Sequence, residues 1–174
     1  MRAPHSALIP AEAFHLAFDA AFAPAAAAAG LSRRGTKWKL VVAGHGLQLG
    51  FPVNKRGAGL ADIPGEFRPQ LSWQGTVSYY QYTSEAELME MQALRRGVVQ
   101  KVVARGRPNA ILASTIDGLD IPLRAQHPDV WLYYFDHHDA AAWGGWFGAR
   151  VSAWLARFTA APETLEAWCR RVLR

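Results

Sequence analysis

The spacing of the apolar residues changes early in the chain, and this change restricts the possible folds. Phe14, Phe18 and Phe22 recur every four positions, which places them on one face of a helix. Along 37–42, polar and apolar residues alternate instead, as in a strand that is wet on one side. A chain with an amphipathic helix followed by half-buried strands is typical of the α+β class.

The alternating segment predicts an antiparallel hairpin. Gly44, His45 and Gly46 form a compact turn signal, and apolar residues alternate again at positions 47, 49, 51 and 53. Two further strands are expected at 66–73 and at 75–83, and the second of these would carry Tyr79, Tyr80 and Tyr82. Strand candidates also lie at Ile111–Ile116 and Val130–Phe135.

Helices are expected at both ends of the chain and in its middle. Pro24 should end or kink the first helix. Ser84 and Glu87 form a capping-box pattern, which predicts a helix that continues to about residue 105. The last forty or so residues repeat large apolar side chains at helical spacing, first from Trp143 to Phe158 and then from Leu165 to Val172.

Together these patterns predict an α+β fold. We expect a single antiparallel sheet of about five to six strands, with the N- and C-terminal helices packed on one face. Residues 1–10 should be a flexible N-terminus, and residues 11–174 a single domain. The single Cys169 excludes an internal disulfide and is expected to be a buried, inert thiol in the last helix.

Positive charge is concentrated near the N-terminus. The chain has 174 residues and a formal net charge of +5, with 51% hydrophobic and 19% charged residues, a composition that excludes a disordered chain. Residues 1–60 contain seven basic and two acidic residues, so this third of the chain accounts for the whole excess. A basic region favours an acidic partner: nucleic acid, anionic lipid or an acidic protein.

The hairpin 33–56 and the loop 54–65 are therefore the predicted binding surface of a non-enzymatic protein that binds an acidic protein partner. Two alternatives stay open: the charges form a solvated rim, or the same strands bind nucleic acid, with neighbouring aromatic rings stacking on bases. Those aromatic residues could equally fill the core. No cofactor is predicted, and the sequence does not say whether a small molecule binds. The candidate binding residues are Arg33, Arg34, Lys37, Lys39, Asn54, Lys55 and Arg56.

The segment Asp136-His137-His138-Asp139 is the densest cluster of metal-capable side chains. One interpretation is a polar helix N-terminus, with Asp136 or Asp139 as the N-cap. The alternative is a metal-assisted hydrolase or acid/base enzyme that uses Asp136, His138 and Asp139, with His45 as a further candidate. Zinc would still need one or two distant ligands there.

The sequence gives little sign of membrane insertion or export. No stretch approaches the ~20 apolar residues of a membrane-spanning helix. The N-terminus is a poor signal peptide, because Glu12, His15 and Asp19 interrupt its apolar stretch. A cytoplasmic location is therefore expected, with periplasmic export as an alternative.

Short motifs in the first third resemble a known family. Gly30-Leu31, Arg33-Arg34, Trp38, Phe51 and Val53-Asn54 follow an N-terminal amphipathic helix, and a Trp-bearing helical segment closes the chain. This layout resembles the bacterial proteins of domain-of-unknown-function family 4304, in which Leu31 would usually be Phe. The resemblance implies an α+β fold without established catalytic residues. Because some such proteins are encoded near bacterial toxins, it also implies an immunity or partner-binding role.

Overall fold

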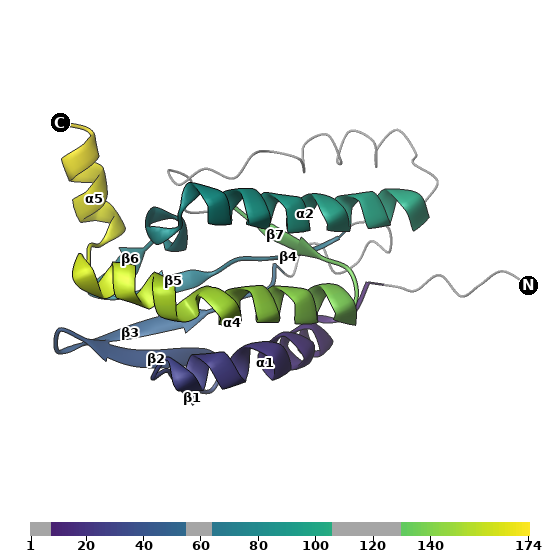
Figure 1. Cartoon of the computed structure of the whole chain (residues 1–174), viewed down its shortest axis with the longest axis horizontal. Helices are drawn as coiled ribbons and strands as arrows, with labels where there is room; N and C mark the ends of the chain where they lie inside the picture. Colours follow the sequence, from purple (N-terminus) through teal and green to yellow (C-terminus); the bar gives the residue numbers. More distant parts are fainter. Residues whose placement is uncertain (1–7, 55–63, 106–129) are drawn as a thin grey trace, which may run out of the picture.

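The computed structural model describes residues 8–54, 64–105 and 130–174, and its fold is α+β (Figure 1). Residues 1–7 of the predicted flexible segment and the predicted strand at 111–116 lie outside the described residues. In chain order the elements are α1 (Ala11–Ala28), β1 (Ser32–Arg34), β2 (Lys37–Val42), β3 (His45–Gly50), β4 (Gly65–Phe67), β5 (Gln70–Ser72), β6 (Thr76–Val77), the 3-10 helix η2 (Tyr79–Tyr82), α2 (Glu85–Arg105), β7 (Leu132–Tyr134), α4 (His137–Ala160) and α5 (Leu165–Val172).

The main sheet is antiparallel and has five strands in the order β1-β2-β3-β5-β6. The predicted hairpin is confirmed: β2 pairs with β3, and Trp38 lies opposite Leu49. Because successive side chains of a strand point to opposite faces, Trp38, Leu49 and Leu71 share the inner face and all three are buried.

The segment predicted as one strand at 66–73 is divided, and the expectation of one continuous strand there is wrong. Pro69 follows β4, and its missing N–H interrupts a strand ladder. On one side of it, β4 pairs with β7 in a separate two-stranded sheet; on the other, β5 joins the main sheet. The strand predicted at Val130–Phe135 is confirmed as β7, although it lies in the smaller sheet.

The predicted strand at 75–83 ends after Val77, and the three tyrosines lie on η2 instead. The backbone carbonyl of Tyr79 accepts hydrogen bonds from Trp154 Nε1 at 2.9 Å and from Thr83 Oγ1 at 2.8 Å. These side chains replace a neighbouring strand as partners. The turn of η2 also buries the rings of Tyr79 and Tyr80 against the helices.

The first helix passes through Pro24 and ends at Ala28, so the proline does not end it. Pro24 is on the exposed side of α1, where a carbonyl left without its helical partner can be hydrated. The helix closes at Gly30, whose φ of +86° is a left-handed conformation that favours glycine. The backbone N–H of Leu31 then donates to the carbonyl of Ala26 at 2.9 Å.

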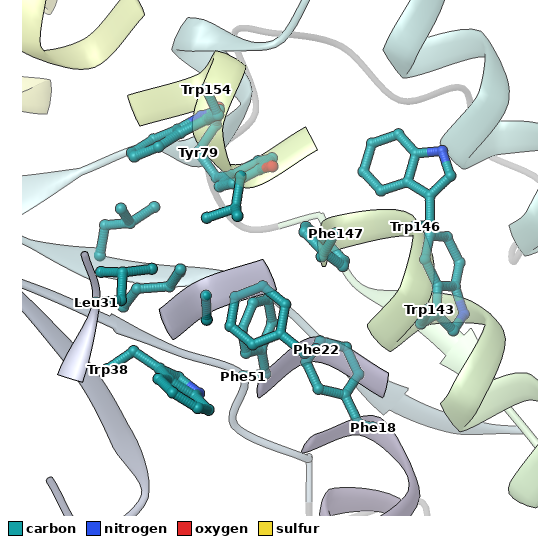
Figure 2. Packing of buried hydrophobic residues seen from close by; sticks show 14 of the residues in the cluster. Phe18, Phe22, Leu31, Trp38, Phe51, Tyr79, Trp143, Trp146, Phe147 and Trp154 are labelled. Carbon is teal, nitrogen blue, oxygen red and sulfur yellow. The ribbon is translucent and has the colours of Figure 1, made fainter. Parts of the chain in front are cut away.

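Helices α1 and α4 lie side by side and cover the inner face of the main sheet (Figure 1). The Phe14, Phe18 and Phe22 stripe is completely buried between them, as the spacing predicted. Figure 2 shows Phe22 close to Phe51 and Trp38, and the ring centroids are 5.3 and 5.4 Å apart. None of the helices that the structure describes packs on the opposite face of the main sheet.

The last helix, α5, contains no buried residue. Cys169 is free and only half-buried, so the expectation of a buried thiol is wrong. The reason is that α5 extends away from the other elements, with its N-terminal end beside β6 (Figure 1).

Candidate binding surface on the open sheet face

The outer side of the main sheet, which we call the open face, carries most of the predicted basic residues. Strand pairing sets Ser32 opposite Lys39 and Arg34 opposite Lys37, and directly paired residues point to the same side of a sheet. The open face consists of the outward positions Ser32, Arg34, Lys37, Lys39, Val41, Gly46, Gln48, Gly50, Gln70, Ser72 and Thr76.

The charge of the open face is positive and is not neutralised by the described residues. Arg34, Lys37 and Lys39 are exposed and form no ion pair within the described ranges. None of the open-face positions is acidic. Acidic side chains on α2 pair elsewhere: Glu87 with Arg157 at 2.8 Å, and Glu90 with Arg150.

Arg33 does not belong to the open face, although the sequence grouped it with its neighbour. It points to the inner side at the sheet edge, where its Nη1 lies 2.7 Å from an Asp19 carboxylate oxygen on α1. Its guanidinium is also 5.8 Å from the ring centroid of Trp38. Arg33 therefore attaches β1 to α1.

Of the other three predicted binding residues, the structure describes only Asn54. Asn54 is half-buried, and its side-chain amide donates to Glu66 Oε2 at 2.7 Å. Its backbone N–H also donates to the Glu66 carbonyl at 2.7 Å, which holds the chain against β4. Lys55 and Arg56 lie outside the described residues.

A shallow hollow of about 40 Å³ lies on the open face, lined by Lys37, Gln48, Gln70, Leu71 and Ser72. Reasoning from the sequence missed the two glutamines and the serine because it selected residues by charge. The sequence did contain a signal for Gln48. It lies between Leu47 and Leu49 in an alternating strand, so its side chain points to the outer face when theirs are buried.

The Asp136–Asp139 segment is a helix N-terminus, which confirms the first interpretation of this motif. Asp136 is the N-cap of α4 and accepts from the Asp139 backbone N–H at 3.0 Å. Asp139 completes the capping box by accepting from the Asp136 N–H at 3.2 Å. Lys101 Nζ lies 3.1 Å from Asp136 and 2.5 Å from Asp139. Burial of Lys101 opposes its charge, but the hydrogen bonds to both carboxylates outweigh this and raise its pKa.

Of the proposed acid/base or metal residues, the structure joins Asp136 and Asp139 in the capping box, where both also contact Lys101, and places His45 elsewhere. His137 and His138 are exposed on the first turn of α4. His45 begins β3, and its ring centroid is 5.8 Å from that of Trp73. The Trp73 ring in turn lies 5.6 Å from that of Phe158, near the C-terminal end of α4. Over the described ranges, no group of three or more His, Cys, Asp or Glu side chains is placed to hold a metal ion.

Comparisons with protein-family models, with curated proteins and with solved structures gave no match for this chain. The resemblance to family 4304 stays a prediction. None of the helices in the described ranges has the length and apolar character needed to cross a membrane.

Proposed function

We propose that this chain is a non-enzymatic binding protein that holds an acidic segment of a partner protein against its open face. The observation that carries the proposal is the group of three cations, Arg34, Lys37 and Lys39, that no described acidic residue neutralises, on a sheet face without acidic positions. Such an arrangement attracts a negatively charged surface and guides its approach. An immunity-type or accessory role, as the resemblance implies, would use such a surface.

The composition of the open face favours an acidic protein over single-stranded nucleic acid. Stacking of bases on aromatic rings is a main source of affinity for single strands. None of the open-face positions is aromatic, and Trp38, the ring nearest to the lysines in the sequence, is only 5% exposed. Val41, which is 72% exposed, instead adds an apolar contact beside Lys39.

The test measures binding of a fluorescent glutamate-rich peptide to the full chain and to the double variant Lys37→Glu/Lys39→Glu. We expect the variant to weaken binding by about tenfold or more, because it replaces two attractions with two repulsions. The matched control is Arg170→Glu/Arg174→Glu, in α5 and just after its end, which changes the net charge equally at a different surface. That control should stay within about twofold of the unchanged protein at moderate salt.

Two outcomes would contradict the proposal. Equal losses in both double variants would show that only the total charge matters. Tighter binding of a single-stranded oligonucleotide than of the peptide, with an affinity that falls steeply with salt, would favour the nucleic-acid alternative.

A further inference from the structure

Gly50 lies beside the hollow on the open face, next to two of the residues that line it, Lys37 and Gln70. Along the strand pairing, Gly50 lies between Lys37 and Gln70, so the row Arg34, Lys37, Gly50, Gln70 has one position without a side chain. The gap faces outward, because Gly50 shares the phase of Gln48 and is opposite to the buried Leu49.

Four of the five residues that line the hollow carry side-chain hydrogen-bond donors, the fifth is Leu71, and none is acidic. Lys37 supplies an ammonium, Gln48 and Gln70 supply amide N–H groups, and Ser72 supplies a hydroxyl. Gln48 lies directly opposite Ser72, and Gly50 opposite Gln70, so these donors come from neighbouring strands of a rigid ladder. A hollow of about 40 Å³ is larger than the roughly 10–15 Å³ needed to hold one water molecule, and so has room for one small polar group.

We propose that this hollow, the Gly50 notch, binds one Asp or Glu carboxylate of an acidic polypeptide. This inference rests on the proposed function and specifies its contact: the ammonium of Lys37 pairs with the carboxylate charge while the amides and hydroxyl donate to its oxygens. Hydrogen bonds to an ionised group are the strong ones, and a planar carboxylate with two oxygens can accept several. Arg34 and Lys39 then attract the flanking acidic residues.

The test adds bulk at Gly50, beside the lining residue Lys37, without changing any charge. In Gly50→Val, the new Cβ would have only Lys37 Cγ within 4 Å, at 3.6 Å, and the backbone of Gly50 is not in the left-handed region. The matched control is Gly46→Val, on the same strand and the same face, where a Cβ would meet nothing within 4 Å. Binding of the glutamate-rich peptide is measured for both.

We expect Gly50→Val to weaken peptide binding about tenfold and Gly46→Val to change it by less than about twofold. Gln70→Leu, an exposed position, should cause a smaller loss in the same direction and serves as the second variant if Gly50→Val folds poorly. Circular dichroism and thermal unfolding of each variant separate loss of binding from loss of structure.

The outcomes distinguish this inference from the proposed function. If Gly50→Val and Gln70→Leu bind like the unchanged protein while Lys37→Glu/Lys39→Glu does not, the open face binds acidic segments but the notch is not used. If the lysine reversals also leave binding unchanged, the proposed function fails. If Gly50→Val weakens binding of an oligonucleotide but not of the peptide, the ligand is a phosphate and the carboxylate assignment is wrong.

Discussion

At the scale of single residues, His15 gives the protein a sensitivity to mild acid. His15 lies half-buried on α1, with its ring centroid 5.4 Å from that of Phe14. Burial lowers its pKa; Asp19 acts in the opposite direction, and Arg33 adds to the lowering. The unfolded chain therefore takes up the proton at a higher pH than the folded chain does. It follows that stability falls as the pH drops from about 6.5 through the lower folded pKa.

We expect the free energy of unfolding to be smaller at pH 5.5 than at pH 7.5, and the difference to shrink in His15→Gln. Urea unfolding followed by tryptophan fluorescence measures both. Glu87 and Glu163, whose pKa values are lowered in the folded protein, lose their stabilising contribution only below about pH 4.5, outside this window. An identical pH dependence in the variant would show that His15 is not responsible.

At the scale of elements, the contact between α1 and α4 depends on a close approach of two helix backbones. An added Cβ at Gly144 would lie 2.2 Å from the carbonyl oxygen of Phe18 and 3.1 Å from Cβ of Ala21. The first contact is with backbone, which cannot move without shifting the whole helix. Gly148 is similarly close to α1, with Cβ of Ala25 at 3.3 Å.

Gly144→Ala should therefore destabilise the fold by about 1–3 kcal/mol or more, as overpacking of a core does. Its control is Gly145→Ala on the same helix, where an added Cβ meets nothing within 4 Å. That change should stabilise by about 0.5–1 kcal/mol, because alanine restricts the unfolded chain and favours helix. Thermal or urea unfolding of both variants decides, and equal effects would rule out the proposed backbone contact.

The sequence predicted elements best where one physical signal acted alone. The Phe14–Phe22 spacing, the β2–β3 alternation and the Ser84–Glu87 capping box each specify a local structure, and the last is present as reciprocal hydrogen bonds of 2.8 and 3.2 Å. The failures occurred where distant contacts decided. Tyr79 became part of a 3-10 helix because Trp154, far along the chain, donates to its carbonyl and stacks on its ring with the centroids 4.8 Å apart. Figure 2 shows the two side chains next to each other.

The candidate surface was predicted only in part, because its other residues also depend on distant contacts. Alternation alone places Lys37 and Lys39 together. It cannot place Gln70 and Ser72 beside them, because that depends on β5 pairing with β3 after the chain has left the main sheet for β4. Alternation also could not show that Arg33 lies on the other face from the lysines. Arg33 is in β1 and the lysines are in β2, so the alternation does not continue from one to the other.

At the scale of the whole molecule, the two sides of the fold differ in whether their charged residues form ion pairs. The side of α2 and α4 uses its acidic residues in pairs between the helices, from Glu87 with Arg157 to Asp139 with Lys101. The open face has cations without such partners among the described residues. The uneven charge of the sequence thus becomes a difference between two sides of the fold, which is the arrangement that a directed binding surface needs.

Stability should also be unevenly distributed over the molecule, and α5 is where this can be measured. Most of the core is one continuous cluster that joins α1, the main sheet and α4, whereas α5 has no buried residue. At its base, Tyr82 Oη donates to the Ala161 carbonyl at 2.8 Å, and Arg171 pairs with Glu163 at 3.0 Å. Local opening of such an element costs far less than global unfolding.

We therefore expect the amide hydrogens of α5 to exchange at least about a hundredfold faster than those in the middle of α4, because α5 can open while the core stays closed. Hydrogen exchange of the full chain, followed residue by residue, gives both rates. Tyr82→Phe, which removes the hydroxyl that donates to Ala161, should raise the exchange of α5 further and leave that of α4 unchanged. Equal protection of the two helices would mean that α5 opens only when the whole molecule unfolds, and that its exposed contacts hold it as firmly as the aromatic core holds α4.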